Sequence, residues 1–382
     1  MIYFDNSSTT YKKPKCVIKA VKKALTKYSA NPGRGSHNLS LIASDKVLDT
    51  RINLANYFNL PNFENVIFTS GCTESLNLAI MGSAKKNGHI VTTMLEHNSV
   101  LRTITQLTKT HNITYTLVNP NKEGIINPYD IEKAITPKTY LIIVNHTSNV
   151  IGSTQDINKI GEIAKKHKVL FLVDGAQSIG HEQIDMQKDN INLLCGTAHK
   201  GLYGPQGVGF LLINNTSISP IKFGGTGTNS ASIIQPTGNP ESLESGTGPT
   251  PNIIGLNAGL EFVCKRFNKI NLKIKKLSFK ILNYLNSEPK IKVYTTNTKS
   301  GVIGFEVKDL DSSEVVNLLN NVYGICVRGG LHCAPKVHEF LGTTKQGLVR
   351  ISVSYFNTML EVNYLIKSIK NLLKMYLNWI FE

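Results

Sequence analysis

The chain lacks several features that would assign it quickly to a class of protein. Its 382 residues contain no CxxC pair, and no basic segment followed by an apolar stretch opens the chain. We therefore expect no signal peptide and no disulfide framework, but reduced thiols in a cytoplasm. The longest apolar runs, such as Tyr140–Val144 and Val169–Val173, suit buried strands and are far too short to cross a membrane. The six cysteines are scattered: Cys16, Cys72, Cys195, Cys264, Cys326 and Cys333.

Acidic residues are scarce, with 26 Asp and Glu against 42 Lys and Arg and a formal net charge of +16. Such a charge is compatible with binding to nucleic acid or to an acidic partner. However, the lysines are spread along the chain, clusters such as Lys273–Lys276 are small, and the aromatic–basic interleaving of an RNA module is missing. We therefore expect a solvated basic surface and no membrane or nucleic-acid partner. A basic RNA-binding scaffold is the low-ranked alternative, and it would bind RNA in a salt-sensitive way without any cofactor.

Short apolar segments alternate with amphipathic segments through the first part of the chain. This alternation predicts an α/β fold with a mainly parallel sheet covered by helices, in which ligands bind beyond the carboxyl ends of the strands. The expected strands are 65–69, 89–93, 113–118, 140–145, 169–173, 191–195 and 208–213.

A loop rich in Gly, Pro, Ser, Thr and Asn follows at 221–250. Beyond it we expect helices at 251–267 and 272–285 and then a smaller C-terminal α+β unit. We predict three regions: an N-terminal segment that packs with the small domain, a large domain and a small domain, over residues 1–15, 16–255 and 256–382.

A lysine precedes a glycine-rich turn in TAHKGLYGPQGVG, residues 197–209. The amine of Lys200, held in such a turn and aimed into a cleft, can form a Schiff base with a carbonyl, which is how pyridoxal phosphate enzymes use a lysine. In isolation this motif is more often a basic surface loop. Partners elsewhere in the chain decide between the two interpretations.

Polar groups follow the expected strands at four places. In TSGCTE, residues 69–74, free amides at a helix start and the hydroxyl of Thr73 can hold a phosphate, although the motif is not a Walker loop. His97 can stack on a flat ring and shuttle a proton. In isolation, these residues are more often an ordinary helix cap and a structural histidine.

The other two places carry Asn149 and the motif DGAQ, residues 174–177. The amide of Asn149 can donate to a phenolic oxygen, and Gln177 can reach the same ring. Asp174, directly after a strand, can pair with a protonated pyridine nitrogen and so keep the ring an electron sink. Singly these are turn and cap residues, but together with Lys200 they supply what pyridoxal phosphate needs.

With these motifs, the chain resembles the class V aminotransferase-like, fold-type I pyridoxal phosphate enzymes, specifically the cysteine desulfurase and selenocysteine lyase group. The resemblance covers nearly the whole chain. It runs from FDNSSTT, where the family has a DNAATT-like start, through TSGCTESLN, EHNS, SNVIG, DGAQS and AHKGLYGPQGVG to ESGT, RGGLHCAP and VRISVSYFNT.

The resemblance implies that Lys200 is the Schiff-base lysine, that His97 stacks on the ring and that Asp174 pairs with the ring nitrogen. It implies a homodimer, in which Gly225 and Thr226 of the GGTGT segment reach the cofactor phosphate of the other subunit. The other cofactor-binding positions that it implies are Cys72, Thr73, Asn149, Gln177, Thr197 and His199.

The segment RGGLHCAP, residues 328–335, matches the R-x-G-x-x-C-A pattern of the desulfurase branch with a short catalytic loop. This implies that L-cysteine is converted to L-alanine while Cys333, the nucleophile, becomes a persulfide. Cations such as Arg328 should help the thiol to ionise. Arg350 is the candidate clamp for the substrate carboxylate, because a guanidinium fork matches it with two bonds.

Several alternatives remain open in the sequence. Cys333 could be a small buried hydrophobic residue, although its glycine-flanked setting argues against that. A metal site from His332, Cys333 and His338 lacks a fourth ligand, so we predict no metal. Selenocysteine lyase activity fits the same scaffold, and an aminotransferase, epimerase or β-lyase reaction would make Cys333 dispensable. Pro335, where relatives often have glutamine, leaves the sulfur-acceptor protein open, in iron–sulfur cluster assembly or in thiolation.

Overall fold

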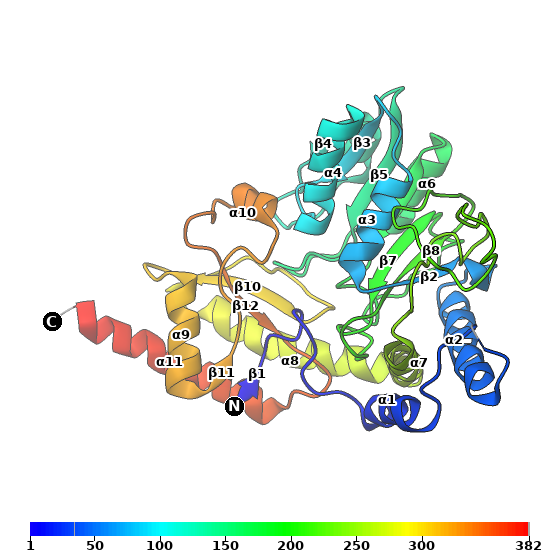
Figure 1. Ribbon diagram of the computed structural model, residues 1–382. Coiled ribbons are helices and arrows are strands. Elements are labelled where there is room, and N and C mark those ends of the chain that lie inside the picture. The colour runs from blue at the N-terminus through cyan, green and yellow to red at the C-terminus, as the bar shows by residue number, and fades with distance from the viewer. Residues whose placement is uncertain (34, 381–382) are drawn as a thin grey trace.

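The computed structural model describes residues 1–33 and 35–380, with side chains through residue 375. A seven-stranded sheet forms its centre, in the order β2-β8-β7-β6-β5-β3-β4 (Figure 1). Strands β4, β3, β5, β6 and β7 run parallel, whereas β8 is antiparallel to both of its neighbours. The predicted α/β fold with a mainly parallel sheet is therefore confirmed. The strands are β2 (Val66–Thr69), β3 (His89–Thr93), β4 (Thr114–Val118), β5 (Thr139–Asn145), β6 (Leu170–Asp174), β7 (Leu193–Thr197) and β8 (Gly209–Ile213).

Helices cover both faces of this sheet because successive strand side chains point to opposite faces. In β2, Val66 and Phe68 join one apolar cluster and Ile67 joins another. The cluster of Ile67 contains apolar side chains of α3 (Cys72–Gly82) and α4 (Asn98–His111). The opposite face packs against α2 (Asn38–Tyr57), α5 (Pro128–Lys133), α6 (Ile157–Lys166) and α7 (Thr250–Cys264), and α1 (Lys15–Lys27) lies against α7.

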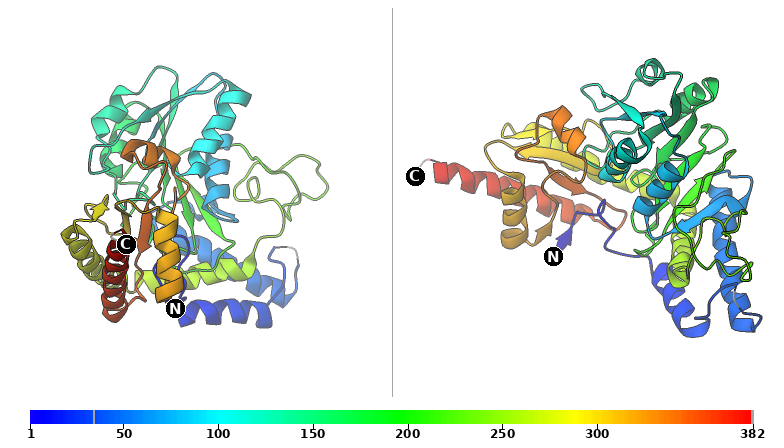
Figure 2. Two further views of the ribbon diagram at one scale, coloured as in Figure 1. Left: turned by 90° about the vertical axis from the view of Figure 1, so that its left-hand side faces the viewer. Right: turned by 45° about the horizontal axis from the view of Figure 1, so that its top comes forward.

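The C-terminal part has a separate apolar core around a three-stranded antiparallel sheet in the order β12-β10-β9. A two-stranded parallel pair, β1 with β11, joins the N-terminus to this part of the chain (Figure 2). The elements of this C-terminal part, together with β1, are β1 (Ile2–Tyr3), α8 (Phe267–Ser287), β9 (Ile291–Val293), β10 (Val302–Val307), α9 (Ser312–Tyr323), β11 (Ile325–Cys326), α10 (Pro335–Leu341), β12 (Val349–Ser352) and α11 (Met359–Ile380). In the large sheet, a short 3-10 helix, η1 (Phe63–Asn65), precedes β2.

One sequence expectation about this region differs from the structure. We expected a break between helices at residues 267–272, but α7 ends at Cys264 and α8 already begins at Phe267. The backbone N–H groups of Lys265 and Arg266 donate back to Glu261 and Val263, which closes α7 without a glycine or a proline to mark the place. The boundary that we predicted between the large and the small domain, at residues 255 and 256, lies inside α7. The domain division stays a prediction.

The arrangement of the sheet gathers the loops that carry the predicted chemistry. Strands β3, β5 and β6 are parallel, so the segments that follow Thr93, Asn145 and Asp174 leave the sheet at the same edge. Among the described residues, no helix combines the length and the apolar character that crossing a membrane requires.

Candidate active site

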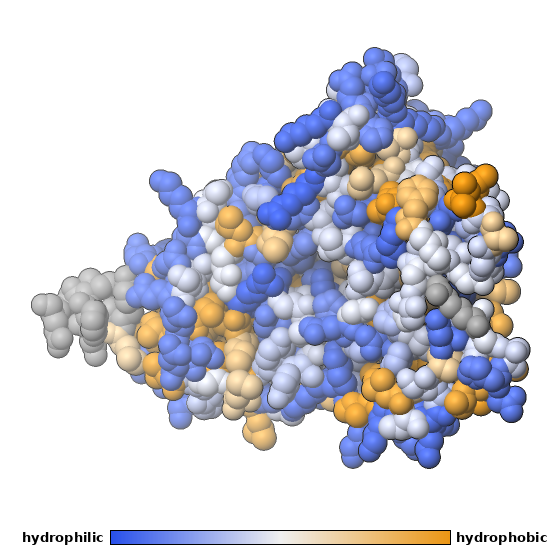
Figure 3. All heavy atoms as spheres, in the orientation of Figure 1, coloured by the Kyte–Doolittle hydropathy of each residue, from blue (hydrophilic) through white to orange (hydrophobic). Residues whose placement is uncertain are grey.

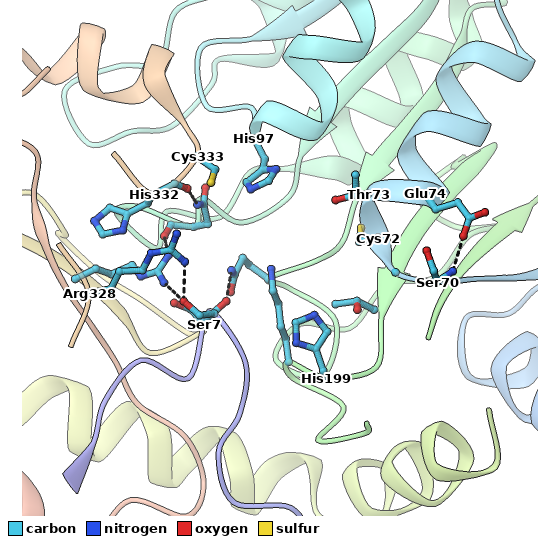
Figure 4. Close-up of a pocket in the computed structure, with 17 residues that line it drawn as sticks. Ser7, Ser70, Cys72, Thr73, Glu74, His97, His199, Arg328, His332 and Cys333 are labelled. Carbon is cyan, nitrogen blue, oxygen red and sulfur yellow. Dashed lines mark hydrogen bonds between the residues drawn. The ribbon is translucent and has the colours of Figure 1, made fainter. Parts of the chain in front are cut away.

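A cavity of about 360 Å³ lies where these loops meet the C-terminal part of the chain (Figure 4). Most residues that the sequence singles out line it, although they come from distant segments. They are Cys72, Thr73, His97, Asn149, Gln177, Thr197, His199, Lys200, Arg328, Cys333 and Arg350.

Three further sequence candidates do not line this cavity directly. Asp174 is buried just behind it, because Sγ of Cys72 lies 3.6 Å from Oδ1 of Asp174 and donates a hydrogen bond to it. Gly225 and Thr226 belong to the long loop after β8, and Thr226 lines a different cavity. Their predicted contact with a second subunit therefore stays a prediction.

Lys200 follows β7 and is fixed from behind by the N-terminal segment. The carbonyl of His199 accepts hydrogen bonds from the backbone N–H of Thr10 at 2.9 Å, from its hydroxyl at 3.0 Å and from Nζ of Lys13 at 3.3 Å. Burial lowers the pKa of the Lys200 amine, with Cys72 and Asp174 acting in the opposite direction. A lowered pKa leaves more of the amine uncharged near neutral pH, which is the form that attacks a carbonyl or accepts a proton.

The carboxylate of Asp174 is oriented by the turn that follows β6. Its Oδ1 accepts a hydrogen bond from the backbone N–H of Ala176 at 2.9 Å as well as the one from Cys72. Desolvation, the largest effect, raises the pKa of the Cys72 thiol well above its usual range, and the Asp174 charge raises it further. Cys72 is therefore a neutral donor to Asp174, not a nucleophile.

His97 caps the N-terminus of α4. Its Nδ1 accepts a hydrogen bond from the backbone N–H of Ser99 at 3.1 Å, so the proton of the neutral ring lies on Nε2. Burial lowers the pKa of His97, and Asp174 opposes that effect. His97 therefore offers the cavity a flat neutral ring with one donor nitrogen.

Several buried polar atoms around Lys200 have no hydrogen-bond partner among the described residues, namely Oγ1 of Thr197, Nδ1 of His199 and Oδ1 of Asn149. Burial lowers the pKa of His199 to about 4, so its ring is neutral. The first amides of α3 have no partner within the helix, and a side chain at Gly71 would meet nothing within 4 Å. Unpaired donors beside open space at a helix N-terminus suit a phosphate. With the Lys200 amine and the Asp174 carboxylate, these residues fit pyridoxal phosphate.

Cys333 lies on a backbone that is held in an unusual conformation. His332 and Cys333 both have left-handed backbones, with φ of 50° and 58°, which non-glycine residues rarely adopt. The carbonyl of Cys333 accepts from the backbone N–H of Asn98 at 2.7 Å, and that of His332 accepts from Nδ2 of Asn149 at 2.6 Å. Nε2 of His332 donates to the carbonyl of Leu348 at 3.0 Å. These bonds fix the segment, while the Cys333 side of the turn stays exposed.

Arg350 is almost completely buried, with 1% of its surface exposed. Its Nη2 donates to Oδ1 of Asp5 and its Nη1 to the carbonyl of Asn149, both at 2.9 Å. Burial lowers the pKa of Arg350, and Asp5 is the largest effect opposing it. Arg328, which is labelled in Figure 4, lines the same cavity. This side of the cavity is therefore cationic, as a site for a carboxylate requires.

Some lining residues have no role assigned from the sequence, namely Ser7, Ser8, Ser70 and Glu74, and His332 was considered there only as a metal ligand. The two N-terminal serines belong to FDNSSTT, which we used only for the family resemblance. The signal that could have found them is the run of four hydroxyl residues at positions 7–10, shortly after the strand at Ile2–Tyr3. Among the described residues, no group of three or more His, Cys, Asp or Glu side chains could hold a metal ion.

Comparisons with known proteins agree with this geometry. Residues 2–365 match the family described as aminotransferase class-V. The chain is 32% identical to a probable cysteine desulfurase of Borreliella burgdorferi, over 98% of this chain and 92% of that protein. It is 30% identical to cysteine desulfurase IscS of Pseudomonas entomophila, over 95% of this chain and 90% of that protein.

A solved structure extends the similarity to the fold. The apo cysteine desulfurase of Thermococcus onnurineus NA1 has a TM-score of 0.91 and 32% identity, over 98% of this chain and 94% of that one. Class-V enzymes of this kind generally use pyridoxal phosphate, the group that the residues around Lys200 fit. The chain therefore belongs to the class-V aminotransferase family.

Proposed function

We propose that the protein is a pyridoxal phosphate-dependent cysteine desulfurase that converts L-cysteine to L-alanine and takes the sulfur onto Cys333. The observation that carries this proposal is that one cavity holds Lys200, Cys333 and Arg350. An amine for the cofactor, a thiol for the sulfur and a cation for the substrate carboxylate are the three groups this reaction needs.

In this proposal the residues around Lys200 hold the cofactor. Asp174 would pair with the ring nitrogen, His97 would stack on the ring, and Asn149 and Gln177 would contact its oxygen. Cys72, Thr73, Thr197 and His199 would hold the phosphate at the N-terminus of α3. When bound, the cofactor stores the electron pair that is freed when Cα loses its proton.

The chain's own residues then direct the substrate. Arg350 and Arg328 bind the carboxylate and so orient the substrate thiol toward Cys333. The uncharged amine of Lys200 accepts the Cα proton and can return a proton later. The thiolate of Cys333 attacks the substrate sulfur, a sulfur–sulfur bond forms and the carbon–sulfur bond breaks. The sulfur is oxidised to the persulfide level, the carbon is reduced to the methyl group of alanine, and no outside oxidant is needed.

We also propose that the protein acts as a homodimer, with Gly225 and Thr226 contributing to the partner's phosphate site. The loop that carries them exposes apolar side chains, with Phe223 at 71%, Ile233 at 103% and Ile234 at 76% exposure. Hydrophobic side chains also gather over α1 and α2 on the face in Figure 3. Apolar groups exposed together in this way are typical of a contact surface.

The deciding experiment measures sulfide and alanine released from L-cysteine by the purified holoenzyme with a thiol reductant. Equal amounts of the two products are expected. Cys333→Ser should abolish sulfide release while keeping the bound cofactor, and Lys200→Ala should lose the cofactor absorbance that borohydride bleaches. Sulfide release that survives Cys333→Ser would contradict the mechanism, and an inactive wild type that still binds cysteine would point to another amino-acid substrate.

A further inference from the structure

The cationic side of the cavity contains two arginines that meet at one serine hydroxyl. Oγ of Ser8 accepts hydrogen bonds from Nη1 of Arg328 at 2.9 Å and from Nη2 of Arg350 at 2.8 Å. It donates to Oδ1 of Asp5 at 2.7 Å. A hydroxyl has one proton and two lone pairs, so these bonds use its full capacity. Because guanidinium groups only donate, the Ser8 proton can point only to Asp5.

The two arginines differ in what else holds them. Arg350 is buried and is fixed by Asp5 and by the carbonyl of Asn149 in addition to Ser8. For the Arg328 guanidinium, the part of the chain that the structure describes supplies one hydrogen-bond partner, Ser8, and no acidic ion-pair partner. The position of the Arg328 guanidinium therefore depends on a single hydroxyl.

The charges of this cluster leave room for one anion. The two guanidinium groups and the Asp5 carboxylate together carry one net positive charge. His332 beside them is neutral, because burial and, to a smaller extent, the charge of Arg350 lower its pKa to about 2. In addition, Nε of Arg350 is buried and has no hydrogen-bond partner among the described residues. Because Arg328 and Arg350 both line the cavity, this net positive charge is the complement of a carboxylate bound there.

We propose that Ser8 is a positioning residue for the substrate carboxylate, because its hydroxyl holds Arg328 against Arg350 so that both guanidinium groups bind one carboxylate. This inference rests on the proposed function, in which the substrate is an amino acid. The like charges of Arg328 and Arg350 repel each other. Without the Ser8 hydroxyl, the long Arg328 side chain would therefore be ordered only when the substrate binds, and the loss of rotamer freedom would weaken binding. The Ser8 hydroxyl orders it beforehand, which improves affinity without a direct contact to the substrate.

The test compares two ligands that differ in the carboxylate, L-alanine and ethylamine, which bind the holoenzyme without being desulfurated. Affinities are read from the change in cofactor absorbance. For Ser8→Ala we expect the affinity for L-alanine to fall about tenfold, since a hydrogen bond to a charged group is lost, while ethylamine binding stays unchanged. With L-cysteine as substrate, KM should rise by a similar factor at nearly constant kcat.

Two variants serve as controls. Ser8→Thr keeps the hydroxyl and should restore the affinity for L-alanine. Ser287→Ala removes an exposed hydroxyl outside the cavity and should leave the ratio of the two affinities unchanged. If Ser8→Ala does not fold, Ser8→Cys offers the same comparison with a much weaker acceptor.

Two outcomes would overturn the inference. Unchanged L-alanine binding in Ser8→Ala would show that the hydroxyl does not prepare a carboxylate site. Equal losses for both ligands would show that Ser8 supports the fold and not the carboxylate. A failure of the proposed function is distinguishable, because then the wild type would bind L-alanine but release no sulfide from L-cysteine.

Discussion

Glu96 is a buried carboxyl group whose charge should make the protein less stable as the pH rises. Its side chain is fully buried behind His97, where Oε1 accepts from the hydroxyl of Thr93 at 2.7 Å and from the backbone N–H of Asn145 at 2.9 Å. Its Oε2 has no hydrogen-bond partner among the described residues. The pKa of Glu96 is raised from 4.5 to about 8. Burial is the largest cause and the charge of Asp174 acts in the same direction, whereas the two hydrogen bonds lower the pKa.

The sign of the pH dependence follows from this shift. The folded protein binds the Glu96 proton more tightly than the unfolded chain does, so the stabilisation is complete below pH 4.5 and is lost as the pH rises to about 8. Each pKa unit corresponds to about 1.4 kcal/mol, so the loss is roughly 2 kcal/mol at pH 6 and about 4 kcal/mol at pH 8. Glu96→Gln has nearly the same shape and carries no titrating proton, so it should not show this loss.

The assay is urea unfolding of wild-type and Glu96→Gln holoenzyme at pH 6, 7 and 8. Subtracting the two free energies of unfolding removes the pH dependence of all shared groups. We expect the difference to change in favour of the Glu96→Gln variant by about 2 kcal/mol between pH 6 and pH 8. Glu123→Gln, at an exposed position, controls for the substitution itself. A difference that stays flat across this range would refute the reasoning, because Glu96 would then be ionised in the folded protein.

Three further predictions concern the site and the loop after β8. Asp174→Asn removes the charge that is proposed to pair with the cofactor, and kcat/KM for L-cysteine should fall at least tenfold, since charged hydrogen bonds contribute about 1.5–3 kcal/mol. Cys333→Ala should keep cysteine binding, measured by cofactor absorbance, but lower sulfide release by roughly a hundredfold or more. Glu244→Ala leaves the buried Arg51, which Glu244 binds at 2.9 Å, without its ion-pair partner and should lower the unfolding free energy by about 3 kcal/mol, whereas Glu241→Ala should have little effect.

The fold could be predicted largely from the sequence because its main signals are local. Short apolar runs bounded by polar turns mark β5 and β6, and amphipathic segments mark the helices between the strands. The antiparallel direction of β8 could not be predicted in this way. Strand direction depends on where the following chain returns to the sheet, and residues 198–208 between β7 and β8 do not form the short two-residue loop that marks an antiparallel hairpin in a sequence.

The residues around Lys200 that line the cavity were predictable one by one, because each strand end places its own polar group, as Asp174 after β6 illustrates. The arginine side of the cavity was not. Ser8 lies 320 residues before Arg328 and 342 before Arg350, and the three meet because β1 pairs with β11 and because Arg328 and Arg350 bridge two backbone segments. The hydroxyl therefore looks like part of an ordinary turn until tertiary contacts place it between two cations. Sequence motifs locate groups that act from one element, whereas a group that acts by holding another side chain in place becomes visible only from the fold.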